Sequence, residues 1–428
     1  MVEPVVAFTA IGVAGSNTLM ATTTRSNPLK RFFIGKPIAT SEDGHQRLPK
    51  KVALPVFASD AISSTTYATE EILIVFMSLA GAGVAAYSRL VPISILVILL
   101  LIIVVSSYRQ TIFAYPNGGG SYVVSRENLG RIPSLVAGGS MLVDYILTVA
   151  VSIAAGVAAI VSAFNGLEPH RVTLCVGFIA LVTLANLRGL KESGALFAPP
   201  TYLYIVMLFI LIGYGLFRVF VQDLGPIPHE DTFSQELLGG NNSITLFFFL
   251  KAFSSGAVAL TGIEAVADGV PAFKKPEPRN ASTTLIIMGC ILGSSFFGLS
   301  VLAQHLHPLK DEEGHIADTV LAQLAEHVYG GRNIMFFLTQ FATFAILILA
   351  ANTAYADFPR LSSIIAKDNY LPRQFMNRGD RLVFSNGVIF LGLASSLLVI
   401  AFGVQGQPNV WDSGATQSLH KGRPGQDQ

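Results

Sequence analysis

The residues that could do chemistry begin with a carboxylate and a run of hydroxyls inside an apolar segment. Residues 52–79 read as a membrane span, but Asp60 and the hydroxyl-rich stretch 63–67 interrupt it. A carboxylate in lipid is costly, and such residues usually face a protein interior or a water-filled path. Backbone without a helical partner is tolerated at membrane depth only where it lines a cavity. We therefore expect a helix broken at its middle that forms half of an ion site. The alternative is a loop joining two short interfacial helices.

A second set of oxygen-bearing side chains has helical spacing. Asp144, Thr148 and Ser152 fall at positions i, i+4 and i+8, on one narrow face of a helix, with Tyr145 beside it. Two hydroxyls alone would more often bond their own helix backbone. A lone carboxylate on the same face needs a partner or a cation, so the stripe is predicted to face the broken segment.

A third set adds neutral oxygens and a candidate proton carrier. Hard cations take oxygen ligands, and unwound backbone at a helix break adds carbonyl oxygens. We expect a cation site in the region of Asp60 and Asp144. Glu264 is the candidate for a coupling proton, the alternative being an ion pair with Lys251 on the same span. Glu70 and Glu71 are expected to line the outer vestibule rather than the site. Neutral oxygens would come from Ser63, Ser64, Thr65, Thr66, Tyr67 and Thr261.

The elements that must position these groups are membrane spans. The chain is 51% hydrophobic and 13% charged, whereas soluble domains are about 25% charged, so an all-α membrane protein is expected. The net charge of +1 gives no indication of nucleic-acid binding. Residues 1–51 are expected to be a cytoplasmic segment, and 404–428 a polar tail without a span. Nine spans are expected within 52–403, at 52–79, 90–113, 135–164, 172–187, 201–221, 244–273, 282–304, 334–358 and 383–402.

Charge placement fixes the expected orientation. Lys and Arg collect on cytoplasmic loops. With a cytoplasmic N-terminus, the inner segments carry 20 of the 28 Lys and Arg and the outer loops carry five. We therefore expect a multi-pass protein of the plasma (inner) membrane whose N-terminus is cytoplasmic.

A weak repeat relates the two most polar spans. The letters FASDA at 57–61 resemble FSSGA at 253–257, and the later span also carries Thr261, Glu264 and Asp268. Two polar-interrupted spans that lie five apart are typical of inverted-repeat transporters, because an odd number of spans reverses the second repeat in the membrane.

These segments resemble a known family. Four features are similar to KimA-type potassium importers. They are the letters FASDAISS from Phe57, Tyr67 seven residues after Asp60, DYILTVAVS from Asp144, and TGIEA from Thr261. Those proteins form part of the KUP branch of the amino acid–polyamine–organocation (APC) superfamily. The resemblance covers about 52–403. It implies a LeuT-like fold of two inverted five-span repeats with broken spans one and six, potassium–proton symport and a homodimer among membrane lipids.

The family's functional residues carry over by motif. The resemblance implies that a potassium path is lined by Asp60, Tyr67, Asp144, Tyr145, Thr148 and Ser152, and that Thr261 and Glu264 serve the site and proton coupling. It implies a transporter rather than an enzyme, with no cofactor beyond the transported ions.

The residues favour potassium over zwitterionic amino acids. Amino acid carriers of this superfamily hold the substrate carboxylate on the free N–H groups of a Gly-rich break. Residues 57–67 contain no Gly and place Asp60 there, which repels a carboxylate and attracts a cation. A polyamine or cationic amino acid is the alternative substrate.

The expected span count departs from the family pattern. A LeuT-like core needs ten spans, whereas nine are expected here, which indicates a product truncated after span nine. A second hypothesis, of another class, is therefore a non-transporting membrane protein, such as a sensor or an inactive truncated product.

Overall fold

The structure is a computed structural model that describes residues 49–116, 118, 120–188, 194–229, 232–310, 318–376 and 385–403. Every element in these ranges is a helix, as expected for an all-α membrane protein. Within the described ranges, eight helical runs are long and apolar enough to cross a membrane. The expected cytoplasmic segment, apart from residues 49–51, and the expected polar tail lie outside the described ranges.

The eight runs coincide with the second to ninth expected spans. The helix of the eighth expected span, 334–358, continues through Pro359 to Lys367. A proline removes one backbone hydrogen bond, which a membrane helix tolerates when its neighbours cover the freed group. The runs comprise α4 (Leu90–Ala114, after the 3-10 turn Gly83–Arg89), α6 (Arg131–Ala163), α7 (Arg171–Leu187), α8 (Gly194–Val221), α10 with α11 (Leu246–Gly256 and Glu264–Asp268), α12 (Glu277–Leu306), α14 (Ile334–Lys367) and α15 (Ser385–Gly403).

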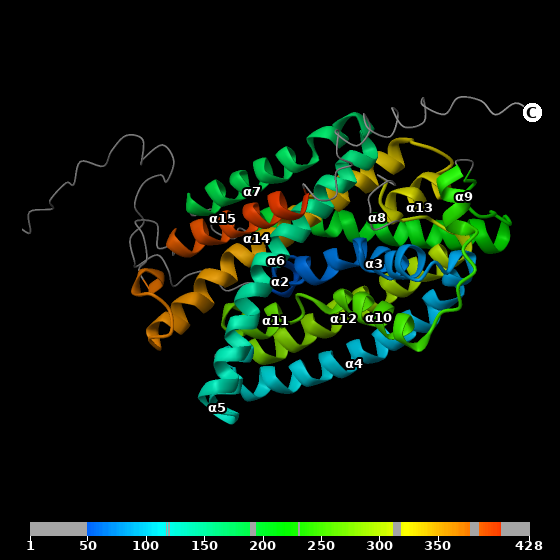
Figure 1. The fold of residues 1–428 in the computed structure, drawn as a ribbon. Helices are drawn as coiled ribbons and strands as arrows, with labels where there is room; N and C mark the ends of the chain where they lie inside the picture. Colours follow the sequence, from blue (N-terminus) through cyan, green and yellow to red (C-terminus); the bar gives the residue numbers. More distant parts are fainter. Residues whose placement is uncertain are drawn as a thin grey trace, which may run out of the picture.

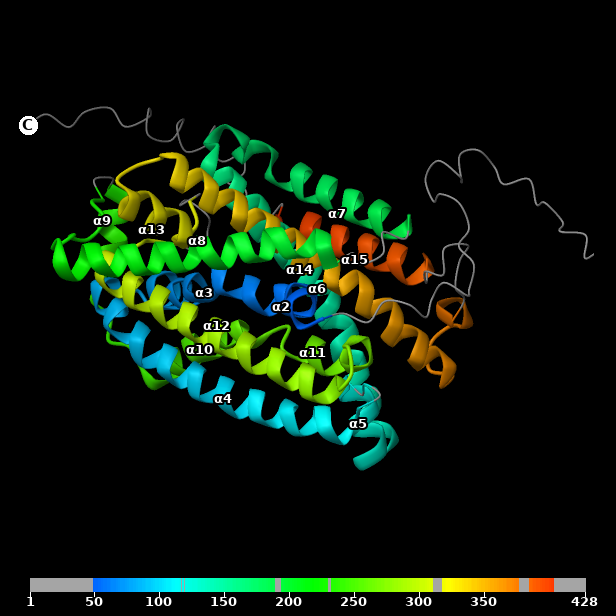
Figure 2. The same cartoon turned by 180° about the vertical axis from the view of Figure 1, so that it is seen from behind.

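The first expected span runs through the middle of the bundle. Its two halves, α2 (Lys50–Ser63) and α3 (Ala68–Ile74), follow one another between two groups of helices (Figure 1). On one side lie α4, α10 and α12, and on the other lie α14, α7 and α15, whereas α6 crosses from α5 to the second group, as the reverse view also shows (Figure 2). Contacts of α2 with α8, α12 and α14 hold it in place.

Short helices mark the two ends of the bundle. The end that carries α5 (Gly120–Asn128) is called the α5 end, and the end that carries α13 (Val320–Tyr329) and α9 (Thr232–Leu238) is called the α13 end. α2 starts at the α5 end, whereas α10 starts at the α13 end. Consequently α10 packs on α3, and α11 packs on α2.

The break in the first span is compact. α2 ends at Ser63, a 3-10 turn covers Ser64–Thr66, and Tyr67 alone departs from helical geometry (φ −124°, ψ −11°) before α3 begins. A π-helical turn, Val75–Leu79, completes the run. This stretch is buried inside the bundle, so the alternative of two interfacial helices joined by a loop is wrong. The cause is the apolar sequence on both sides, which buries each half.

The break in the span α10–α11 is sharper. After α10 the chain forms a 3-10 turn, Ala257–Leu260, and Thr261 is then extended (φ −65°, ψ 153°). Gly262 follows with φ +77°, a conformation that glycine adopts without steric cost. A Cβ atom at this position would lie 2.6 Å from the backbone nitrogen of Ala61 and 2.8 Å from Oδ2 of Asp60. The second break therefore packs directly against the end of α2.

We predict that Gly262→Ala lowers stability by about 2 kcal/mol or more, because the new methyl group meets backbone and the positive φ is strained for alanine. The check is the thermal unfolding midpoint of the detergent-solubilised protein. The matched control is Gly139→Ala on α6, where an added Cβ meets nothing within 4 Å. Equal midpoints for the two variants would contradict the assigned contact.

Candidate ion-binding site

The two helix breaks meet at three contacts. The Ser64 hydroxyl shares its proton between the carbonyl oxygens of Ala61 (2.6 Å) and Ala259 (3.2 Å). The carboxylate of Asp60 lies against Gly262, and the hydroxyl of Tyr67 lies close to the Thr261 side chain. Thr261 in turn donates to the carbonyl of Val258 (2.9 Å). The three residues predicted from the two breaks, Asp60, Tyr67 and Thr261, are thus brought together.

The hydroxyl run divides into two groups. Ser63, Ser64 and Thr65 donate to backbone carbonyls three residues back, at 2.6 to 2.7 Å. Such bonds hold the hydroxyls to their own helix, so these side chains are engaged before any ion arrives. By contrast, the buried hydroxyls of Ser59 and Thr66 have no hydrogen-bond partner in the described part of the chain. Buried polar groups are normally satisfied, so these two are the better candidates for ligands.

The residues of the predicted stripe on α6 differ in solvent exposure. Asp144 is exposed, next to an open groove that apolar residues of α6 such as Val143 and Leu147 line. Thr148 is half-buried, and Ser152 is buried with no partner for its hydroxyl among the described residues. The back-bonding alternative therefore does not apply to Ser152. Tyr145 packs beside Tyr122 on α5.

Asp144 and Asp60 interact electrostatically across the gap between α6 and α2. In the region that the structure describes, Asp60 has no basic partner, and no three His, Cys, Asp or Glu side chains are grouped closely enough to hold a metal ion. A cation held here would therefore draw on hydroxyl and carbonyl oxygens as well as these carboxylates.

Glu264 is held by α5 and α4. Its Oε1 accepts hydrogen bonds from the backbone N–H (2.8 Å) and the hydroxyl (2.9 Å) of Ser121, and its Oε2 accepts one from Tyr108 (3.2 Å). Lys251 is exposed and is not among these partners, so the alternative of a Lys251 ion pair is wrong. The break at Thr261 reorients the helix, which turns Glu264 toward the α5 end.

A second carboxylate fixes the other side of α5. Asp368, just beyond α14, accepts a hydrogen bond from the hydroxyl of Tyr122 (2.7 Å) and pairs with Arg126. Burial, reinforced by the neighbouring Asp368 carboxylate, raises the pKa of Tyr122 to about 12. The tyrosine therefore remains a hydrogen-bond donor throughout the physiological pH range. α5 is clamped between Glu264 and Asp368.

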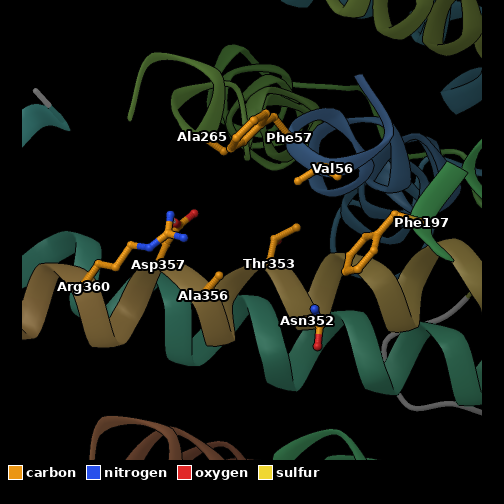
Figure 3. A pocket seen from close by; sticks show the side chains of 9 residues that line it. All are labelled: Val56, Phe57, Phe197, Ala265, Asn352, Thr353, Ala356, Asp357 and Arg360. Atoms are coloured by element: carbon orange, nitrogen blue, oxygen red, sulfur yellow. The ribbon is translucent and has the colours of Figure 1, made fainter. Parts of the chain in front are cut away.

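Two further carboxylates near the site were not predicted. Asp268 ends α11 and lies against Gly120, where an added Cβ would be 2.7 Å from its Oδ1. Asp357 on α14 pairs with Arg360 at 3.5 Å, and the two heads turn toward each other beside a small pocket that Phe57 and Ala265 also line (Figure 3). Electrostatic interactions connect Asp357 to Asp60 and to Asp268. The carboxylates of Asp60 and Asp268 therefore each interact with the Asp357 carboxylate inside the bundle.

Sequence signals for the missed residues differ in strength. Asp268 stood in a polar-interrupted span and Asp357 stood one turn before Arg360, so both were visible as intramembrane charges. Tyr204 of α8, which hydrogen-bonds Thr65 at 2.8 Å, had no such signal, because a tyrosine in an apolar helix is common. Tyr108 and Ser121, the partners of Glu264, were hidden in the same way.

Comparison with known proteins identifies the family. A sequence model described as amino acid permease matches residues 54–412. The chain belongs to the amino acid permease family. The match includes both helix breaks, the α6 stripe and Glu264.

Three relatives bear names that state different cargoes. The chain is 48% identical to the potassium transporter KimA of Bacillus subtilis over 88% of its own length and 60% of that protein. It is 22% identical to the low-affinity putrescine importer PlaP of Escherichia coli K12, over 63% of this chain and 57% of that protein. It is 26% identical to the probable potassium transport system protein Kup 2 of Aeromonas hydrophila, over 52% of this chain and 36% of that protein. The chain spans less than two thirds of each relative.

Removing either carboxylate that clamps α5 should loosen this helix. We predict that Glu264→Ala or Asp368→Ala speeds tryptic cleavage after Arg126 or Arg131 by about fivefold or more, because cleavage requires local opening of the segment. Digestion of the detergent-solubilised protein, followed by mass spectrometry of the fragments, measures this rate. Glu236→Ala, an exposed substitution on α9 at the other end, is the control, and equal rates in all variants would contradict the clamp.

Proposed function

We propose that this chain forms the membrane part of a secondary active transporter that takes up potassium together with protons. The observation that carries the proposal is the Asp60 carboxylate, which lies where the two helix breaks meet and has no basic partner in the described residues. An anion within a membrane span is costly unless a cation or a proton neutralises it. The likeness to the potassium transporter KimA supports potassium as that cation.

The ligand set would combine charge with neutral oxygens. Asp60 and Asp144 would supply the charge, and the neutral oxygens would come from Tyr67, Thr261, Ser152, Thr148 and Tyr145. Potassium is a weakly hydrated monovalent ion, and sites built largely from carbonyl and hydroxyl oxygens replace its hydration shell. The break at Thr261 and Gly262 contributes carbonyl groups that no longer pair within a helix.

Glu264 is proposed as the proton carrier. Its carboxylate accepts three hydrogen bonds, two of them from Ser121 at the start of α5. Protonation would reduce its capacity to accept hydrogen bonds from this helix. A proton on Glu264 would therefore change both the local charge and the hold on α5, which is what coupling requires.

The arrangement of the spans fits a LeuT-like inverted repeat. The broken spans start at opposite ends of the bundle and pack half against half, as two repeats of opposite orientation would. The excess of Lys and Arg on the α5-end segments supports a cytoplasmic α5 end and N-terminus in the plasma membrane. A homodimer remains a prediction from the family resemblance.

A second candidate substrate is a polyamine or a cationic amino acid. The likeness to the putrescine importer PlaP favours it, and the acidic region would attract an organic cation as well. Competition separates the two candidates. Excess putrescine or arginine should leave rubidium uptake unchanged if potassium is the substrate, and should abolish it if the site accepts organic cations.

We predict that Asp60→Asn and Asp144→Asn each reduce rubidium uptake at least about 100-fold, because the neutral amide removes the charge that offsets cation dehydration. Uptake is measured in a host that lacks its own potassium importers, with membrane abundance checked by immunoblot. Glu236→Gln is the control and should retain parental uptake. Unchanged uptake in either Asp variant would contradict the site. Absence of uptake by the parent chain would favour the non-transporting alternative.

We further predict that uptake rises as external pH falls and that Glu264→Gln removes this dependence, since the isosteric amide carries no titratable proton. The check is a series of initial rates between about pH 5.5 and 8 at fixed membrane potential. Glu127→Gln, an exposed substitution on α5, should keep the parental profile. A Glu264→Gln variant with the full parental pH response would move the coupling role to another carboxylate.

A further inference from the structure

A separate cavity lies on the α13-end side of Tyr67. It measures about 190 Å³, and its lining includes Thr66, Tyr67, Glu71, Ala155 and Thr343. These residues come from the first span, α6 and α14, so the cavity is enclosed by the same helices that build the central site. Neither Asp60 nor Asp144 lines it. Tyr67 thus stands between this cavity and the central carboxylates.

Two adjacent glutamates meet this cavity in different ways. Glu70 is neutralised, because Lys310 lies 3.4 Å from its Oε1 and the backbone N–H of Val320 donates to its Oε2 (2.9 Å). Val320 is the first residue of α13, so Glu70 also caps that helix. Glu71 has no such hydrogen bond or ion pair among the described residues. Its carboxylate is the one that the structure leaves available to a ligand.

The basic residues around Glu71 do not neutralise its charge. Lys310 acts on both glutamates but is in contact with Glu70. Arg171 also lines the cavity, and it lies 4.0 Å from Glu168. With each basic residue closer to another carboxylate, one negative charge remains in excess at the cavity. Such a concave, partly desolvated carboxylate concentrates cations.

An unpartnered hydroxyl lies beside the same space. Thr66 lines the inner end of the cavity and is 8% exposed, and its Oγ1 has no hydrogen-bond partner in the described part of the chain. A buried hydroxyl without a partner is uncommon, and its two lone pairs can coordinate a cation. Its neighbours Ser64 and Thr65, in contrast, bond to backbone carbonyls.

We propose that Glu71 and the Thr66 hydroxyl form a staging site for a monovalent cation, entered from the α13 end and separated from Asp60 by Tyr67. The inference rests on the proposed transport function and adds a step to it: the ion is concentrated and partly dehydrated at Glu71 before it passes Tyr67. Glu70 has the structural role, and Glu71 has the binding role.

Protection of an introduced cysteine tests the site without requiring transport. Ala155→Cys, in a background with Cys175→Ala and Cys290→Ala, places a thiol on the cavity lining. Whole cells are treated with a membrane-impermeant cationic methanethiosulfonate reagent in potassium chloride or choline chloride of equal ionic strength. We expect potassium, but not choline, to slow labelling, and Glu71→Gln to raise the potassium concentration for half-protection by about fivefold or more. Glu236→Gln should leave it unchanged.

Measuring potassium protection of Ala155→Cys in the Asp60→Asn background separates the staging-site proposal from the transport proposal. Protection should persist in this background although transport is lost. In rubidium uptake, Glu71→Gln should raise KM by a similar factor with the maximal rate retained, as expected for a site that delivers the ion. Three results would overturn the inference: no labelling of Ala155→Cys from outside, equal protection by choline and potassium, or a Glu71→Gln variant with parental half-protection.

Discussion

The close approach of Gly262 to the end of α2 is the constraint on which the rest of the site depends. The peptide nitrogen of Ala61 and the carboxylate of Asp60 occupy the volume that any side chain at residue 262 would need. The break in the α10–α11 span exists because glycine permits φ +77° there. From that turn follow the extended Thr261, which meets Tyr67, and the redirected α11, which carries Glu264 to α5. Without this contact, the two breaks would not meet.

Much of this arrangement could be predicted from the sequence, because charge inside an apolar run is a strong signal. Asp60, Asp144 and Glu264 stood out for that reason, and the helical elements followed from hydropathy. The interruption at 63–67 was also visible, although its form as a 3-10 turn was not. Hydroxyls gave a poorer signal. Ser63 and Ser64 are residue types that can serve as cation ligands, yet their hydroxyls bond to backbone carbonyls of their own helix. Whether a hydroxyl bonds locally depends on its rotamer, which the sequence does not specify.

Tertiary partners account for the rest of what sequence could not supply. Glu264 and Lys251 share a span, and that made an ion pair between them plausible. The structure instead pairs Glu264 with Ser121 and Tyr108, more than 140 residues away along the chain. The same holds for Glu70 and Glu71, which are adjacent and chemically identical but differ in environment. Glu70 pairs with Lys310 and with the first backbone N–H of α13, whereas Glu71 lines the same cavity without such a partner among the described residues, a distinction that no local pattern contains.

The 3-10 turn at Ser64–Thr66 gives the first span an adjustable length. A 3-10 helix rises about 2.0 Å and turns about 120° per residue, against about 1.5 Å and 100° for an α-helix. Conversion of this three-residue turn to α geometry would shorten the run by roughly 1.5 Å and rotate α3 by roughly 60° relative to α2, with the hydrogen-bond count nearly conserved. Such a conversion would therefore combine a shortening of the span with a rotation of α3. The change in length is small, but the 3-10 turn lies between Asp60 and Glu71. A small change in its winding would therefore move the Tyr67 ring relative to both carboxylates.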